Sequence, residues 1–194
     1  MSPHATTTPR LELRLPGRGE TVALAPGEAL LIDGDASPVV RALVGGGSAG
    51  WARLDGVRLR GEIARRVRGG LGIVRDVPVA PEVSVLDHLA ARVGADTAER
   101  ALEGAPLLAG RGGDLAGVLS GGERTVLAWL RALVTGPRAL LLLRAGEGLD
   151  EATLAWAADR VAEQRARGVS VVVVAGRPQE RAWAEPGGRL WLPG

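Results

Sequence analysis

The residues best suited to chemistry are Leu119-Ser120-Gly121-Gly122-Glu123, a glycine-rich turn that leads directly into an apolar-periodic segment. Apolar side chains follow at the spacing of one buried helix face: Val126, Leu130, Leu133 and Val134. Ser120 stands where a helix N-cap is expected. The first-turn amides, the Ser120 hydroxyl and the two glycines could together accept an anion. An ordinary capped helix without a ligand explains the same residues, so the turn alone leaves both interpretations open.

Composition removes several other kinds of site. The 194-residue chain has no Cys, which excludes disulfides and thiolate metal sites, and only two His, which disfavours a His-based metal site or triad. Net charge is only +2, and without Lys, Tyr or Cys almost nothing titrates between neutrality and the Arg range, so the pI of 10.6 does not indicate a basic surface. We therefore expect no nucleic-acid partner.

The chain shows no segment for membrane insertion. No apolar run approaches the roughly 20 residues that span a bilayer, and the first residues are polar and rich in Pro and Thr, unlike a signal peptide. We expect residues 1–10 to form a disordered tail. The expected location is cytoplasmic, with peripheral attachment to the inner face of the cell membrane through a partner.

Short strands alternate with helices along the rest of the chain, which predicts an α/β fold with a mostly parallel sheet. The expected strands are 11–15, 21–24, 29–32, 72–74, 139–143, 169–174 and 189–192, with a hairpin over 51–59 that turns at Asp55-Gly56. The expected helices are 39–44, 62–68, 84–93, 97–103, 122–135, 151–167 and 179–184. Residues 76–120 contain no predicted strand and are interpreted as a helical insert.

The sequence Leu119–Glu123 resembles the signature motif of the ATP-binding-cassette (ABC) ATPases, and the residues that follow it as far as Arg138 are similar to that family too. Further resemblances come in the family's order: Ala25-Pro26-Gly27-Glu28, Leu54-Asp55-Gly56, Val83–Leu89, and the D-loop Gly148-Leu149-Asp150. The likeness is greatest to the branched-chain amino-acid uptake branch. It implies a P-loop NTPase-like (RecA-like), mostly parallel sheet with a helical insert and a small antiparallel N-terminal β region. Residues 11–192 would form one domain, with its core at 11–75 and 121–192 and its insert at 76–120.

The phosphate loop of that family is not present. Its pattern G-x-x-x-x-G-K-[ST] cradles phosphates with amides, a Lys and a Mg²⁺-binding hydroxyl. This chain instead has a shorter loop with two carboxylates and no Lys, made of Asp33, Gly34, Asp35, Ala36 and Ser37 before Pro38. We interpret Ser37 as a helix cap only.

The remaining catalytic positions are also lost. After the apolar strand 140–143 the family has a Mg²⁺-binding Asp and a water-activating Glu, whereas this chain has Arg144 and Ala145. The expected Gln falls on Arg75 or Asp76, and the expected switch His falls on 175–176. Because loss of one charge-stabilising group commonly costs about 10²–10³ in rate, we expect no hydrolysis by this chain.

The exchange of charge between the two loops leads to a separate prediction. The family has Lys in the first loop and Asp in the second, whereas this chain has carboxylates in the first and Arg144 in the second. We predict that Arg144 pairs with Asp33 or Asp35 in the space of Mg-nucleotide, with two solvated side chains as the alternative.

The resemblance implies a degenerate ATP-binding subunit. Ser120, Gly121, Gly122 and Glu123 would contact the ATP held by a competent partner subunit, on a membrane permease, with Leu149 and Asp150 in the D-loop. The chain would have no metal or cofactor of its own, and Mg-ATP would be shared with the partner. A pseudo-ATPase scaffold or regulator that binds no nucleotide is the alternative, and a residual ATPase is the third. Permease contact would fall near 75–100, where Val77, Val79, Val83 and Val85 form either that surface or the insert's own core.

Overall fold

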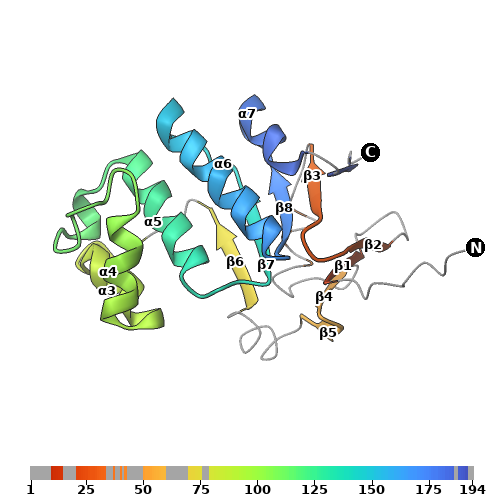
Figure 1. The fold of residues 1–194 in the computed structure, drawn as a ribbon, viewed down its shortest axis with the longest axis horizontal. Helices are drawn as coiled ribbons and strands as arrows, with labels where there is room; N and C mark the ends of the chain where they lie inside the picture. The colour runs from red at the N-terminus through yellow and green to blue at the C-terminus, as the bar shows by residue number, and fades with distance from the viewer. Residues whose placement is uncertain are drawn as a thin grey trace, which may run out of the picture.

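The computed structural model describes residues 10–14, 21–33, 37, 40, 42, 50–59, 70–75, 79–185 and 188–191. Two sheets and a set of helices pack in layers (Figure 1). The predicted helix 62–68 lies outside the described residues, as do most of the predicted helix 39–44 and residues 1–9. Arg10, which we expected in the tail, instead donates its N–H to the Leu24 carbonyl at 2.8 Å.

The central sheet is parallel and its strand order is β6-β7-β8-β3-β9. Its strands are β6 (Leu71–Val74), β7 (Ala139–Leu143), β8 (Ser170–Val174), β3 (Ala29–Ile32) and β9 (Arg189–Trp191). Every residue of β8 is buried, as are the first four of β7, because layers cover both faces of the sheet. This explains the continuous apolar runs in the sequence.

A smaller antiparallel sheet covers one face, in the order β2-β1-β4-β5. Its strands are β1 (Leu11–Arg14), β2 (Thr21–Leu24), β4 (Trp51–Leu54) and β5 (Val57–Arg58). Alternate residues point inward, so that Leu11, Leu13 and Leu54 pack against the central sheet. The predicted turn of the hairpin is confirmed, with Asp55 and Gly56 at φ +48° and +78°, as a type I′ turn requires.

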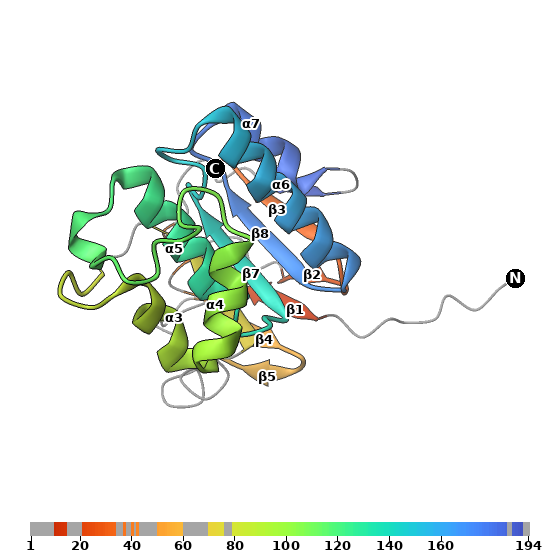
Figure 2. The same ribbon diagram turned by 60° about the vertical axis from the view of Figure 1, so that its left-hand side comes forward.

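The helices cover the other face (Figures 1 and 2). They are α3 (Val85–Val93), α4 (Ala95–Glu103), α5 (Gly121–Leu133), α6 (Glu151–Ala166) and α7 (Pro178–Arg181), with the 3₁₀ turns η2 (Ala116–Val118) and η3 (Ala182–Ala184). The predicted helix 179–184 is therefore divided between α7 and η3. Ser84 caps α3 as predicted, because its Oγ accepts the Asp87 N–H at 3.0 Å.

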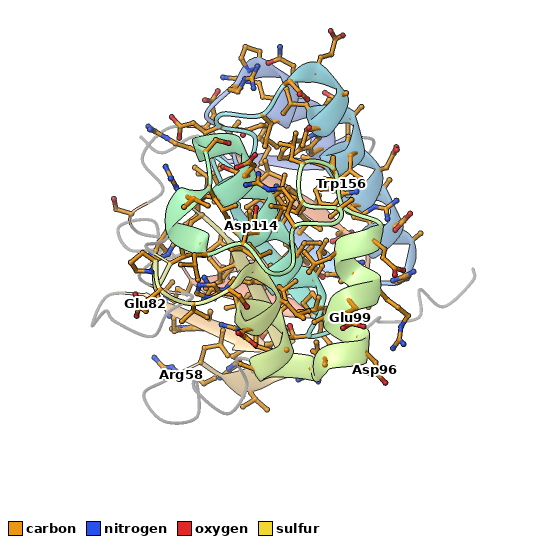
Figure 3. All side chains as sticks on the ribbon, turned by 90° about the vertical axis from the view of Figure 1, so that its left-hand side faces the viewer. Arg58, Glu82, Asp96, Glu99, Asp114 and Trp156 are labelled. Atoms are coloured by element: carbon orange, nitrogen blue, oxygen red, sulfur yellow. The ribbon has the colours of Figure 1, made fainter. Side chains whose placement is uncertain are left out.

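Helices α3 and α4 lie beside α5, with the acidic residues Glu82, Asp96 and Glu99 exposed on that side (Figure 3). Of the four valines considered for a permease surface, Val85 is fully buried and Val79 packs against the main core. Val83 is half-buried, and Val77 lies outside the described residues. The core interpretation therefore holds for Val85 and Val79.

Candidate functional site

The carboxyl ends of β6, β7 and β8 meet at one edge of the parallel sheet, where ligands of open α/β sheets usually bind. Each strand is followed there by a loop, and the loops after β7 and β8 span 144–150 and 175–177. The amino terminus of α5 comes to the same edge, since Gly122 meets Gly148 of the loop after β7. The structure thus brings the predicted signature, the predicted D-loop and the positions of Arg144 and Ala145 together.

The signature turn forms a complete capping box, as its predicted cap requires. The Glu123 N–H donates to Ser120 Oγ at 3.3 Å, and the Ser120 N–H donates to Glu123 Oε2 at 2.8 Å. The hydrogen bond from the Ser120 N–H and the guanidinium of Arg111 lower the pKa of Glu123. Arg111 also binds Asp114, labelled in Figure 3. Glu123 is therefore held ionised and fixes the turn, while Ser120 and Gly121 stay exposed.

The turn is packed against the loop after β7. A Cβ added to Gly122 would lie 2.7 Å from the Gly148 carbonyl oxygen, so only glycine permits this approach. One turn further along α5, the Thr125 hydroxyl lies 3.0 Å from the Glu147 carbonyl oxygen and 3.1 Å from that of Gly121. The signature turn and the loop that contains the D-loop are therefore packed together as one structural unit.

Trp129 fixes the other side of this unit. Its buried indole N–H donates to the Ala145 carbonyl at 2.8 Å. Its ring packs edge-on against Trp156 of α6 at 6.1 Å and against Trp183 of η3 at 5.7 Å between centroids. Helical periodicity predicted the buried face of α5 from Val126 and Leu130 but missed Trp129, because periodicity does not show which Trp residues meet in space.

Glu180 is the second residue that sequence reasoning missed. It is 0% exposed, and its carboxylate accepts the backbone N–H groups of Gly146, Gly176 and Arg177. Arg177 in turn donates to the carbonyls of Gly146 and Leu149 at 3.0 and 2.8 Å. This network binds the loop after β7 to the loop after β8. The sequence did contain a signal for this role, because Glu180 stands three residues after Arg177, the N-cap of α7, as in a capping box.

The predicted partner of Arg144 is wrong as far as Asp33 is concerned. Asp33 pairs with Arg181 of α7, with oxygen–nitrogen distances of 3.0 and 2.9 Å. Arg144 lies instead against Gly176, where an added Cβ would come within 2.8 Å of its Cγ. Gly34 and Asp35 lie outside the described residues, so the alternative with Asp35 stays a prediction.

The other predicted positions have structural roles. Asp150 caps α6 by accepting the Thr153 N–H at 2.7 Å, a hydrogen bond that lowers the pKa of Asp150. Leu149 and Ala145 are buried. Ser37 is helical, but residues 34–36 and 38–39 lie outside the described residues, so its capping role stays a prediction.

The residues directly after β7 do not fit a magnesium ion. The residues that follow β7 are the cationic Arg144 and the apolar Ala145, whereas Mg²⁺ takes carboxylate and other oxygen ligands. Among the residues that the structure describes, no three His, Cys, Asp or Glu side chains are grouped to hold a metal.

Comparison with known structures identifies the architecture. An ATP-binding subunit of an ABC transporter matches with a TM-score of 0.74 and 18% identity, over 86% of this chain and 79% of that one. A nucleotide-free ATP-binding cassette of an ABC transporter gives 0.72 and 17% identity, over 95% and 88%. A structure of the ADP conformation of an ATP-binding cassette of an ABC transporter gives 0.70 and 17% identity, over 95% and 87%.

The fold is that of an ATP-binding cassette. No family model matches the sequence, and no curated protein matches it. The structure shows the cassette fold, and short sequence motifs resemble it. The sequence identity to these known structures is too low to assign an activity to this chain. Within the described part of the chain, no helix combines the length and apolar character needed to cross a bilayer.

Proposed function

We propose that this cassette is a degenerate ATP-binding subunit that does not hydrolyse ATP itself and supplies Leu119–Glu123 to the ATP site of a competent partner subunit on a membrane permease. The observation that carries the proposal is the contrast within one edge of the sheet. The signature turn is fully formed, with Ser120 and Gly121 exposed, while Arg144 and Ala145 follow β7 in place of metal ligands.

The finer features belong to the same proposal. Residues 76–120 are the helical insert of a RecA-like core, and the likeness is to the branched-chain amino-acid uptake type. The working unit is a heterodimer with Mg-ATP shared between its subunits. Its place is cytoplasmic and peripheral at the inner face of the cell membrane. In that dimer Ser120 and the Gly121 and Gly122 amides contact the partner's γ-phosphate.

A scaffold or regulator that binds no nucleotide is the second candidate. It is favoured by the internal bonds of the signature turn, because Ser120, Glu123 and Thr125 all make hydrogen bonds that need no ligand. A retained helix cap alone would preserve these residues.

Substitution of Ser120 separates the two candidates. The tagged chain would be isolated with its membrane complex from the native cell, as wild type, as Ser120→Arg, and as Ala166→Arg, which adds the same charge to an exposed position at the far end of α6. Under our proposal Ser120→Arg abolishes the ATPase activity of the complex without preventing assembly, and Ala166→Arg does not. Equal ATPase activity in all three complexes contradicts the proposal and favours the scaffold.

A further inference from the structure

A small pocket of about 140 Å³ opens at the carboxyl ends of β6 and β7, beside the amino terminus of α5. Three of its lining residues are arginines from three different elements: Arg75 follows β6, Arg124 belongs to α5, and Arg144 follows β7. Gly121 and Thr125 of the first turn of α5 complete that side. We call this the arginine pocket.

The described lining of the arginine pocket has more basic than acidic residues. It includes three arginines and one acidic residue, Glu147, all four of them exposed. Among the described residues, none of Arg75, Arg124 and Arg144 forms an ion pair. The positive end of the α5 dipole adds to the same potential. Because positively charged side chains that lie close together repel one another, a bound anion would lower the energy of such a group.

Contacts within the chain already restrict two of the arginines. Arg124 donates from Nη1 to the Leu119 carbonyl at 2.6 Å. Arg144 has a left-handed backbone at φ +49°, its N–H donates to the Val174 carbonyl at 3.0 Å, and its side-chain carbons rest on Gly176. A preorganised group loses less conformational entropy when a ligand binds.

We propose that the arginine pocket binds a phosphate-class oxyanion without magnesium, either as a free anion or as the terminal group of a polyphosphate. Guanidinium groups suit this ligand because their paired N–H donors match phosphate oxygens. The pocket has room for one such group. Its described lining has one carboxylate, that of Glu147, which is too few to hold a magnesium ion. The site uses residues of this chain alone, so it is independent of the partner subunit proposed above.

The test measures binding of inorganic phosphate, pyrophosphate, ATP and adenosine to the isolated chain by calorimetry, each with Mg²⁺ and with EDTA. Saturable binding of one or more of the three phosphate-containing compounds in EDTA, weakened by salt, is the expected result, and adenosine should not bind. Binding of phosphate itself points to a free anion, and binding of ATP alone points to a nucleotide. No saturable binding, or binding that requires Mg²⁺, overturns the proposal.

Matched variants locate the site. Arg144→Asn removes the charge while keeping a residue type that tolerates a left-handed backbone, and Arg75→Gln removes a second charge. Each should raise Kd about ten-fold or more, since a hydrogen bond to a charged group contributes about 1.5–3 kcal/mol. Glu147→Gln should tighten binding, and Arg167→Gln, an exposed charge at the end of α6, should leave Kd unchanged. An equal loss in Arg167→Gln would refute the pocket in favour of general charge attraction.

Discussion

Replacement of Glu180 by glutamine tests whether one buried carboxylate holds the two loops of the candidate site together. Glu180→Gln keeps the size and shape of the side chain. It changes one acceptor oxygen into an NH₂ group that can only donate. One side of the carboxylate receives the Gly146 N–H and the other receives the N–H groups of Gly176 and Arg177. Whichever way the amide turns, a donor then faces a donor.

The expected cost follows from this geometry. At least one charge-assisted hydrogen bond is lost and at least one backbone N–H has no acceptor, which together destabilise the chain by about 2–4 kcal/mol. For a chain of this size each kcal/mol lowers Tm by about 2–4 °C, so Tm should fall by roughly 5–15 °C. Gln179→Ala, an exposed neighbour on the same short helix, should change Tm by no more than a degree or two.

Thermal melts of the three proteins measure the global effect, and amide hydrogen exchange measures the local one. In Glu180→Gln the amides of Gly146, Gly176 and Arg177 should exchange faster than in the wild type, beyond any change in the buried strands β7 and β8. A variant that melts within about 2 °C of wild type, with these amides still protected, would show that the carboxylate does not hold the loops.

Two further predictions concern the signature turn and the D-loop. Gly122→Ala should destabilise the protein by about 1–3 kcal/mol, because the added Cβ would overlap the Gly148 carbonyl. Gly121→Ala should not change stability, because the space around its position is open. Chemical denaturation compares the two variants, and equal stability would contradict the packing argument. Acid should also weaken the fold. In the folded chain the pKa values of Glu123 and Asp150 lie below their ordinary values near 4, so the unfolded chain takes up protons first as the pH falls. The stability that these two carboxylates contribute is complete above their ordinary pKa values and is lost as the pH falls through the lower, folded-state values. Unfolding at pH 7, 5, 4 and 3 should show this loss below about pH 4, with a shallower fall in a Glu123→Gln/Asp150→Asn double variant; an identical fall in both proteins would assign the acid sensitivity to other carboxylates.

Local signals made most of the fold predictable. Continuous apolar runs marked β7 and β8 because layers cover both faces of the central sheet. Asp55-Gly56 marked its hairpin, and Ser84 and Ser120 marked the starts of α3 and α5, since turns and caps depend on residues close in sequence. Helix ends were less exact, as α5 stops at Leu133 and the last predicted helix divides into α7 and η3.

The contacts that build the site depend on residues distant in sequence, which periodicity does not reveal. Glu180 reaches Gly146 across 34 positions, and Trp129 reaches Trp183 across a still longer stretch of sequence. The expected pairing of Arg144 with Asp33 assumed that exchanged charges must meet. It failed for Asp33 because α7 supplies a nearer cation, Arg181, while the left-handed backbone of Arg144 directs its side chain over Gly176.

Because Arg144 does not pair with Asp33, the exchange of charge between the two loops has a different consequence for the site. An arginine paired with Asp33 would have closed the cassette's nucleotide position with an internal ion pair. Arg144 instead lines one pocket together with Arg75 and Arg124, and Glu147 is the acidic residue among the described lining. Under our two proposals, the loop after β7 lacks the oxygen ligands that a metal needs, and the arginine pocket offers the donors that an oxyanion needs. A cassette that only decayed would lose the first property without acquiring the second, so binding of phosphate in EDTA would favour a retained, altered site over a remnant.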